Sequence, residues 1–412
     1  MKHLLKHFNI IVIGGGAAGF FTAINAAENN PDLSIAILER GKDFLTKVKI
    51  SGGGRCNVTH AEFLPKELTK NYPRGEKELL GPFHGFMTGD TIAWFADRGI
   101  ELKIEEDGRM FPISDSSQTI IDCFISETKR LNIDILTNHS VKEISRIDDM
   151  FQIITASEAF SADKIVMATG SNPKIWQLLE NLGHNIIDPV PSLFTFNIKD
   201  ERIIDLPGIA TEVSLKVISG NYTLLESEGP LLITHWGMSG PAILKLSAWG
   251  ARLLEPTKYN FTLQINWLLY ASEDETIENL KHLKILLAKK TVLKNPQFEL
   301  SKRLWHNLMR AVGLDEAKKW AELSNIDLAN IAAQLTKCQF TVNGKSTFKE
   351  EFVTAGGIDL KEVNFKTFES KIHSGLFFAG EILNIDAITG GFNFQNAWTS
   401  GFMAAKAISE NG

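Results

Sequence analysis

Short apolar runs that end in glycine mark the first and last parts of the chain. Phe8–Ile13 leads directly into a glycine-rich turn, the alanine-rich segment Ala17–Asn29 follows, and Ser34–Leu38 is again apolar. Short β-branched runs bounded by glycine are typical of buried parallel strands, and a segment rich in alanine favours a helix. The pattern therefore predicts a strand–helix–strand unit at the start of the chain.

The next stretch combines loop, hairpin and helix signals. We expect residues 41–60 to form a long loop. Between Glu101 and Ile113 the pattern predicts a hairpin that turns at Asp107-Gly108. Gln118–Leu131 has apolar residues at helical spacing. Four strand-like segments follow, at residues 134–136, 141–146, 151–156 and 164–168.

Residues from about 190 to 350 differ in character from the segments on either side. Residues 193–270 indicate short strands joined by turns, residues 272–336 indicate charged helices, and residues 339–342 return to a strand pattern before the turn Asn343-Gly344. We expect an α/β fold of the Rossmann type with an inserted domain. The first domain then comprises residues 1–190 and 351–412, and the insert comprises residues 191–350, β-rich over 191–270 and helical over 272–337.

The turn after the first strand carries glycine at three fixed positions, Gly14, Gly16 and Gly19. In dinucleotide-binding folds, glycines at this spacing let the backbone turn, approach a pyrophosphate and pack the helix on the strand. A helix that begins at Ala17 offers unpaired N–H groups to the phosphates. Glu39 ends the second strand, where its carboxylate can accept from both ribose hydroxyls. A chance glycine-rich turn is the alternative, and the strand, the helix and Glu39 together disfavour it.

Two later strand ends extend this site. Thr169-Gly170 follows an apolar run, and Gly380-Glu381 ends another near the C-terminus. Each alone is compatible with an ordinary strand end. A glycine here lets backbone approach a phosphate, and Glu381 can bind ribityl hydroxyls. The three segments in this order predict one long dinucleotide held by both ends of the chain, and that cofactor is FAD.

A helix is also expected after Gly390-Gly391, over about residues 394–408. Its N-terminus, near Gly391 and Phe392, favours negative charge on a reduced flavin ring. Asn393 is a candidate N-cap. An ordinary capped C-terminal helix is the alternative.

The segment Ser51-Gly52-Gly53-Gly54-Arg55-Cys56-Asn57 lies within the expected loop. Consecutive glycines indicate backbone packed against a flat or charged ligand, and Arg55 can neutralise phosphate or a reduced ring. Disulfide-reducing flavoenzymes carry two cysteines spaced by four residues in such a loop, and here Ala61 follows instead. Dithiol exchange is therefore excluded, and Cys56 is either a reactive thiol or a packed residue, the second being favoured.

Composition and residue spacing argue against a nucleic-acid partner, disulfides, a membrane span and a metal site. The chain carries 43 Lys and Arg against 49 Asp and Glu, so its net charge of −6 predicts no nucleic-acid partner. Three dispersed cysteines predict no disulfides and a reducing, cytoplasmic setting. No apolar stretch approaches the roughly 18 residues of a membrane span, and the Cys and His positions show no metal-ligand spacing.

With these motifs, the chain resembles a bacterial family of FAD-dependent oxidoreductases typified by aminoacetone oxidase and the flavoprotein of bile-acid dehydroxylation. The resemblance covers nearly the whole chain and is most specific at residues 51–59, 229–241 and 354–395. It implies a glutathione-reductase-like FAD domain with an insert and noncovalent FAD. Departures at His60, Asn384 and Ala387 leave the substrate open. The expected cofactor-binding residues are Gly14, Gly16, Ala17, Ala18, Gly19, Glu39, Arg40, Lys47, Ser51, Gly53, Gly54, Arg55, Cys56, Asn57, Val141, Thr169, Gly170, Gly380, Glu381, Gly391, Phe392 and Asn393.

The catalytic residues are not identified by any motif. Because a flavin itself carries the electrons, no triad is required. The candidates are His235, Ser239 and Cys56. For His235 and Ser239 a structural turn is the favoured alternative, and Pro241 breaks the Gly-x-Ser-x-Gly frame around Ser239.

No second Gly-x-Gly-x-x-Gly, which would mark a dedicated nicotinamide domain, occurs between residues 60 and 374. NAD(P)H is therefore expected as a transient reductant, or oxygen as the acceptor.

Three functions stay open. The favoured one is a flavin oxidoreductase acting on a small organic molecule. The second is a flavin-dependent RNA-modifying enzyme, which predicts a basic surface stripe and which the acidic net charge disfavours. The third is a flavin-binding sensor without turnover. The oligomeric state is not predicted.

Overall fold

The computed structural model describes residues 5–147, 149–220, 222–346 and 353–410. The chain forms two compact units, one made of residues 1–190 with 353–412 and the other of residues 191–352. Each unit has its own apolar core.

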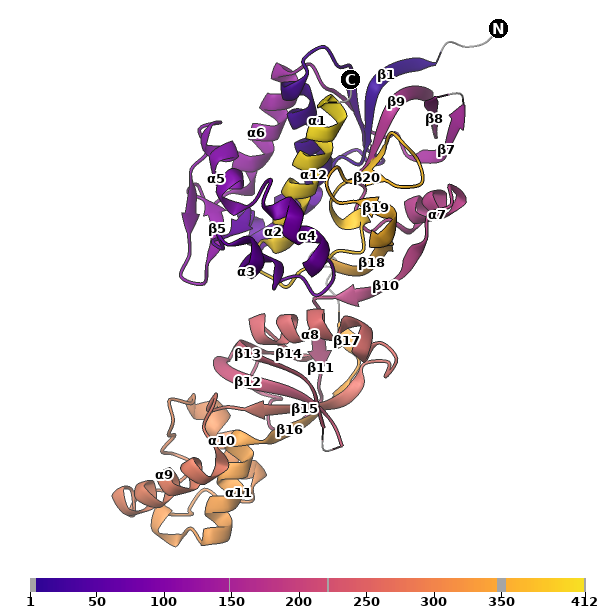
Figure 1. Cartoon of the computed structure of the whole chain (residues 1–412). Coiled ribbons are helices and arrows are strands. Elements are labelled where there is room, and N and C mark those ends of the chain that lie inside the picture. The colour runs from indigo at the N-terminus through magenta and orange to yellow at the C-terminus, as the bar shows by residue number, and fades with distance from the viewer. Residues whose placement is uncertain (1–4, 148, 221, 347–352, 411–412) are drawn as a thin grey trace. The chain divides into compact units, whose positions relative to one another are not determined.

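A mixed sheet with a parallel central part lies at the centre of the first unit (Figure 1). β9 pairs in parallel with β1 on one side and with β21 on the other, so a strand from the end of the chain lies two places from the first strand. Residues of β1 and β2 are buried on both faces, as expected of parallel strands between helices. The order is β19 (Val363–Asn364), β20 (Glu369–Ser370), β21 (Leu376–Phe378), β9 (Ala159–Met167), β1 (Lys6–Ile13), β2 (Ile35–Leu38) and β6 (Asp134–Leu136), with β7 (Val141–Ile147) and β8 (Met150–Thr155) attached through β9.

Helices and two small sheets complete this unit. α1 and α12 lie side by side (Figure 1), and they approach closely because Gly401 faces Thr22, whose hydroxyl lies 2.9 Å from the position of an added Cβ. The helices are α1 (Ala17–Asn29), α2 (Thr46–Gly54), α3 (Pro65–Thr69), α4 (Glu76–Phe83), α5 (Thr88–Ala96), α6 (Ser117–Arg130), α7 (Pro173–Asn181) and α12 (Phe392–Glu410), with 3₁₀ turns at Leu360–Glu362 and Gly380–Ile382. The small sheets are β3 (Thr59–His60), β5 (Arg109–Pro112) and β4 (Leu102–Ile104), and β10 (Ile186–Ser192) with β18 (Val353–Ile358).

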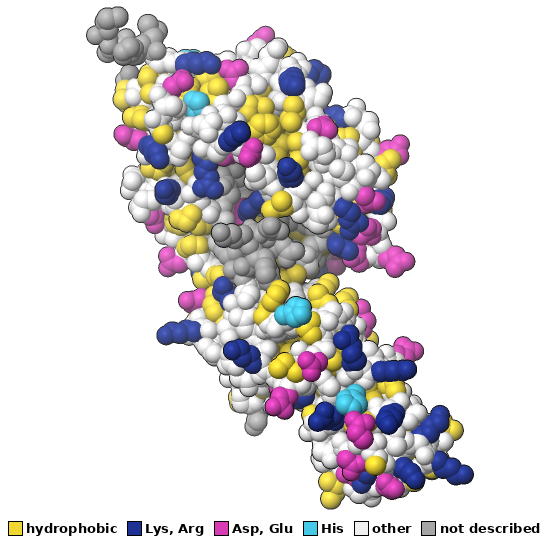
Figure 2. All heavy atoms as spheres, turned by 180° about the vertical axis from the view of Figure 1, so that it is seen from behind, with side chains coloured by type: hydrophobic (Ala, Val, Ile, Leu, Met, Phe, Trp, Pro, Cys, Tyr) yellow, Lys and Arg dark blue, Asp and Glu magenta, His cyan; other side chains and the backbone are white. Residues whose placement is uncertain are grey.

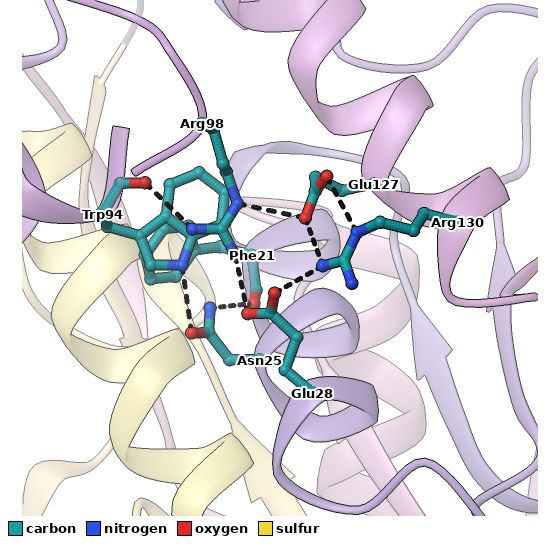
Figure 3. Close-up of polar contacts among 7 residues, drawn as sticks. All are labelled: Phe21, Asn25, Glu28, Trp94, Arg98, Glu127 and Arg130. Carbon is teal, nitrogen blue, oxygen red and sulfur yellow. Dashed lines mark hydrogen bonds and ion pairs between the residues drawn. The ribbon is translucent and has the colours of Figure 1, made fainter. Parts of the chain in front are cut away.

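A network of charges joins α1 to α5 and α6 (Figure 3). Glu28 accepts from Arg98 and from Arg130, each at 2.6 Å, and Glu127 accepts from Arg98 at 3.2 Å and from Arg130 at 2.6 Å. The hydrogen bond from Arg130, followed by the charge of Arg98, lowers the pKa of Glu127. Arg98 and Glu127 are each only 12% exposed, so this network is partly screened from solvent.

The second unit combines an antiparallel sheet with helices. Its sheet order is β16 (Cys338–Asn343), β15 (Asn260–Asn266), β12 (Ala210–Ser219), β13 (Tyr222–Thr234), β14 (Gly237–Ser239), β11 (Thr195–Asn197) and β17 (Lys345–Ser346). The helices are α8 (Pro241–Leu254), α9 (Glu273–Leu286), α10 (Lys302–Ala311) and α11 (Asn325–Thr336), with a 3₁₀ turn at Trp320–Glu322.

Two sequence expectations are corrected here. Residues 41–60 are not one long loop, because α2 and β3 lie within them. Residues 193–270 are not only short strands, since β13 has 13 residues and α8 has 14. α2 was not predicted because it contains three consecutive glycines. The length of β13 was not predicted because many polar residues lie on its exposed face.

Candidate functional site

The glycine turn after β1 is fixed by close backbone contacts. A Cβ added at Gly19 would lie 2.0 Å from the carbonyl oxygen of Gly14, and one added at Gly14 would lie 2.4 Å from that of Ala168. Gly14 also has φ +120°, which L side chains rarely adopt. These two glycines are therefore required by packing, and they hold α1 against the end of β9.

Gly16 is different, because nothing in the protein requires a glycine there. Its φ is −98°, and an added Cβ would meet no heavy atom within 4 Å. The N–H groups of the first turn of α1, including those of Ala17 and Ala18, have no acceptor within the helix. An open position beside these donors fits a pyrophosphate that approaches the backbone.

Glu39 lies at the end of β2 and faces this turn. Its carboxylate accepts from the N–H of Gly15 at 3.0 Å and from that of Gly41 at 2.8 Å. The backbone N–H of His139 donates to the carbonyl of Glu39 at 2.8 Å, which brings the start of β7, and Val141 with it, to this side of the sheet. Arg40 is exposed. Ribose binding by Glu39 stays a prediction.

Glu381 brings the last part of the chain to the same edge of the sheet. Lys47 donates to one carboxylate oxygen at 2.6 Å, and the N–H of Thr354 donates to the other at 3.3 Å. A Cβ added at Gly170, beside Thr169, would lie 3.5 Å from Glu381, and one added at Gly380 would lie 3.0 Å from Ala18. The three glycine segments singled out in the sequence therefore converge at the carboxyl ends of β1, β9 and β21.

Thr354 is a site residue that the sequence did not indicate. Its side chain is buried, and its hydroxyl has no hydrogen-bond partner among the described residues. A buried polar group without a partner costs free energy unless a ligand or water satisfies it. Thr354 therefore fits a cofactor whose hydroxyl or phosphate oxygens lie beside Glu381.

The segment Ser51–Asn57 begins inside α2, a helix that is broken internally. Ser51, Gly52 and Gly53 within α2 have non-helical backbone angles, and Gly52, Gly53 and Gly54 all have positive φ. A Cβ added at Gly52 would lie 2.8 Å from the ring of Phe111, whereas one at Gly53 would meet nothing within 4 Å. Gly53, like Gly16, thus leaves open space at its surface.

Arg55 is held by the protein itself. Its guanidinium donates to Glu105 at 2.5 Å, contacts Asp115 at 3.5 Å and lies 3.9 Å from the centroid of the Phe111 ring. The hydrogen bond to Glu105 is the largest cause that raises the pKa of Arg55. These contacts give Arg55 an anchoring role in the loop, and neutralisation of phosphate or flavin by it stays a prediction.

Cys56 is fully buried, and burial raises the pKa of its thiol to about 12. The thiolate is the nucleophile in cysteine chemistry, so this residue has little reactive form at neutral pH. The arrangement favours the packing role over a reactive thiol.

The N-terminus of α12 meets the strand that follows Cys56. With its amide oriented to satisfy its partners, Asn57 accepts from the N–H of Gly391 at 3.0 Å and donates to the carbonyl of Thr59 at 3.0 Å. His60 stacks on Phe392 with ring centroids 4.4 Å apart, and its Nδ1 lies 3.0 Å from the carbonyl oxygen of Gly390. Two segments more than 300 residues apart thus form one wall at the start of α12.

Asn393 does not cap this helix as expected. α12 begins at Phe392, one residue earlier, and the Asn393 side chain pairs with both backbone groups of Ala387, at 3.0 and 3.2 Å. The amide therefore fixes the loop before the helix. Gln395, which the sequence did not indicate, is fully buried and accepts from Thr59 at 2.6 Å.

The candidate catalytic residues His235 and Ser239 belong to the second unit. His235 is exposed in the turn between β13 and β14, and Ser239 ends β14 just before α8. Their participation in chemistry stays a prediction.

The amino-acid sequence that forms this site matches a known protein family. A family model described as the HI0933-like protein Rossmann domain matches residues 8–407. The chain belongs to the HI0933-like family. This match confirms the α/β Rossmann fold and the resemblance inferred from the motifs.

Three full-length relatives are informative about this HI0933-like chain. A ribosomal RNA dihydrouridine synthase from Haemophilus influenzae is 30% identical over 97% of this chain and 98% of its own length. A protein of the same name from Escherichia coli is 26% identical over 98% of each chain. A 3-dehydro-bile acid delta(4,6)-reductase from Clostridium scindens is 27% identical over 97% of this chain and 98% of its own.

The HI0933-like chain thus belongs to a family of FAD-binding flavoprotein oxidoreductases. None of the helices formed by the described residues has the length and apolar composition that a bilayer crossing needs. Within the same described ranges, no three His, Cys, Asp or Glu side chains gather as metal ligands.

Proposed function

We propose that this protein is an FAD-dependent reductase of a carbon–carbon double bond conjugated to a carbonyl, and that its substrate is a uracil ring in ribosomal RNA. The observation that supports the substrate is the 30% identity, over nearly the full length of both chains, to a ribosomal RNA dihydrouridine synthase. The sequence alone favoured a small organic substrate, and its net charge of −6 disfavoured RNA.

A shared reaction supports the chemistry. The C5=C6 bond of uracil is conjugated to a carbonyl, as are the double bonds that a 3-dehydro-bile acid delta(4,6)-reductase acts on. For uracil, the net reaction adds hydride at C6 and a proton at C5, and oxidises one NAD(P)H. The residues at the carboxyl ends of β1, β2 and β21 would hold FAD, which would supply hydride transfer between NAD(P)H and the substrate.

The chain contributes binding and orientation. Gly16 leaves open space beside the first N–H groups of α1, where a pyrophosphate would fit, and Gly53 also leaves open space. Glu39 and Glu381 place carboxylates at the ends of β2 and β21, where sugar and ribityl hydroxyls would be bound. The N-terminus of α12 carries a partial positive charge and would favour a negatively charged group bound beside it.

A second candidate function is reduction of a small, conjugated organic molecule. The observation that favours it is the 27% identity to the bile-acid reductase. The two functions share the cofactor site and differ in what docks beside it. A sensor without turnover is the third possibility, and it predicts a flavin that no nicotinamide reduces at a useful rate.

The test uses purified, FAD-loaded protein under anaerobic conditions. NADH or NADPH is added with unmodified rRNA transcripts, and the digested nucleosides are analysed for dihydrouridine, which is two hydrogens heavier than uridine. A parallel reaction contains a steroid dienone instead of RNA. Dihydrouridine in the RNA reaction supports the proposal. Flavin bleaching by NAD(P)H with no dihydrouridine in any transcript would refute the RNA substrate, and absence of bleaching would favour the sensor.

A further inference from the structure

The helical part of the second unit carries a local excess of positive charge. From Lys281 to Lys319 the sequence has ten lysines and arginines and three acidic residues, a net charge of +7 in a chain whose total is −6. Dark blue Lys and Arg side chains recur over the lower end of the view in Figure 2, with acidic side chains among them. The overall acidity of the chain therefore hides a basic region.

Three of these lysines are brought together by two paired backbone segments. The N–H of Trp320 donates to the carbonyl of Lys290 at 3.0 Å, and that of Val292 donates to the carbonyl of Lys318 at 2.9 Å. Thr291 and Lys319 form an isolated bridge between the same segments. We call the exposed side chains of Lys289, Lys290 and Lys319 the lysine platform.

The lysine platform rests on a rigid base. Trp305 and Trp320 are fully buried, stack with ring centroids 6.2 Å apart, and lie beneath the paired segments, where the Trp305 indole donates to the carbonyl of Val292 at 2.9 Å. The paired backbone fixes the positions from which the three exposed lysine side chains extend.

The three lysines have no ionic partner of their own. Among the residues that the structure describes, no carboxylate lies within ion-pair distance of Lys289, Lys290 or Lys319, whereas the adjacent Lys318 pairs with Asp327 at 3.7 Å. Unpaired, exposed cations on a rigid surface are suited to a polyanion, because neutralising phosphates releases condensed counterions.

We infer that the lysine platform binds phosphates of the RNA backbone and so anchors the RNA substrate on the second unit. This inference rests on the proposed function, which makes RNA the substrate. Lysine provides a point charge without base selectivity, so the platform supplies affinity and leaves the choice of base to the flavin site.

The test compares two triple variants with equal loss of charge. The platform variant carries Lys289→Gln, Lys290→Gln and Lys319→Gln. The control variant carries Lys77→Gln, Lys129→Gln and Lys366→Gln, three exposed lysines of the first unit that form no ion pair with any described residue. FAD content and the unfolding midpoint are measured first, and both variants should match the wild type.

Binding to unmodified rRNA transcripts is then measured from 50 to 300 mM KCl. For single strands, each neutralised phosphate contributes roughly 0.7 to the magnitude of the slope of log K against log salt. The platform variant should therefore have a slope smaller in magnitude by about two, and its affinity at 100 mM salt should be lower by about tenfold or more. The control variant should retain the wild-type slope.

The outcomes separate this inference from the proposed function. Equal slopes in all three proteins, or equal losses in both variants, would overturn the lysine platform even if dihydrouridine forms. A platform variant that loses the slope while no protein makes dihydrouridine would support the surface and refute the function. Flavin bleaching by NAD(P)H, which needs no RNA, should be the same in all three proteins.

Discussion

The two ends of α1 have opposite chemistry. At the N-terminal end, the backbone carries only glycine and alanine, and the position of an added Cβ at Gly16 is open. At the C-terminal end, Glu28 is held by Arg98 and Arg130 (Figure 3). One helix thus has an end without polar side chains and an end whose charge is fully paired within the protein.

This difference separates binding from stability. An end that the protein satisfies with its own side chains contributes to folding and offers nothing to a ligand. An end with free N–H groups, an open glycine and, nearby, the Thr354 hydroxyl, which has no partner among the described residues, gains its partners when a ligand binds. Variants at the two ends should therefore change different measurements.

The largest expected effect comes from Gly16→Ala. Its methyl group would occupy the space through which a pyrophosphate approaches the backbone, so FAD binding should weaken by about a hundredfold, or about 3 kcal/mol. The measurement is the ratio of flavin to protein absorbance after purification and titration with FAD. Gly81→Ala is the matched control, since an added Cβ there also meets nothing within 4 Å. Full FAD occupancy in Gly16→Ala would contradict the assignment of this end.

Arg98→Ala should act on stability instead. The substitution leaves two carboxylates, Glu28 and Glu127, with only the more exposed Arg130, and should lower the free energy of unfolding by about 2–3 kcal/mol. Urea unfolding measures this loss, and FAD content should not change. Arg130→Ala, at a side chain 53% exposed, should cost less than about 1 kcal/mol. A reversed order of the two variants would contradict the description of this network.

Glu39→Gln tests the adenosine end of the site. Loss of one charged acceptor should weaken FAD binding by about tenfold, the effect of roughly 1.4 kcal/mol from a charge-assisted hydrogen bond. Titration with FAD, compared with titration by FMN, measures it, because FMN lacks the adenosine. An equal loss for both flavins would show that Glu39 acts through the fold of the Gly15 turn.

The smallest expected effect is on the pH dependence of stability, which should differ between His60 and the charge network around Glu127. Burial lowers the pKa of His60 below its ordinary value of 6.5, so its contribution to stability is present above that pH and is lost as the pH falls through the lowered pKa. The lowered pKa of Glu127 places the loss from the charge network below its ordinary value of 4.5. Lowering the pH from 7.5 to 5.5 should therefore reduce the free energy of unfolding of the wild type more than that of His60→Asn.

His235→Asn is the control for this pH dependence, because His235 is exposed. It should retain the wild-type difference between the two pH values. A His60→Asn variant with an unchanged difference would assign the loss to other buried histidines such as His184, whose pKa burial also lowers.

The sequence predicted those elements whose local signals agree with their packing. α1 occupies the expected residues because a glycine turn precedes an alanine-rich segment, and the hairpin turns at Gly108, whose φ is +83°. α2 was missed because three glycines with positive φ disguise a helix. Asn393 was misread because its partner, the backbone of Ala387, lies in a loop whose path only the fold determines.

Side-chain pairs between distant segments were beyond the sequence. Lys47 and Glu381 were each expected at the cofactor, but nothing indicated that they pair across 334 positions. No motif marks Gln395 or Thr354 in the sequence, and both become informative only once their burial is known. The basic region was concealed because the net charge averages over the whole chain.

The position of β21 and α12 has a consequence for biosynthesis. Because both lie beyond residue 370 yet pack against β9 and α1, a ribosome must synthesise these residues before the candidate site has all its walls. A shorter nascent chain presents only part of that site. The strands β1, β2 and β9 therefore lack the packing of α12 until that helix has been synthesised.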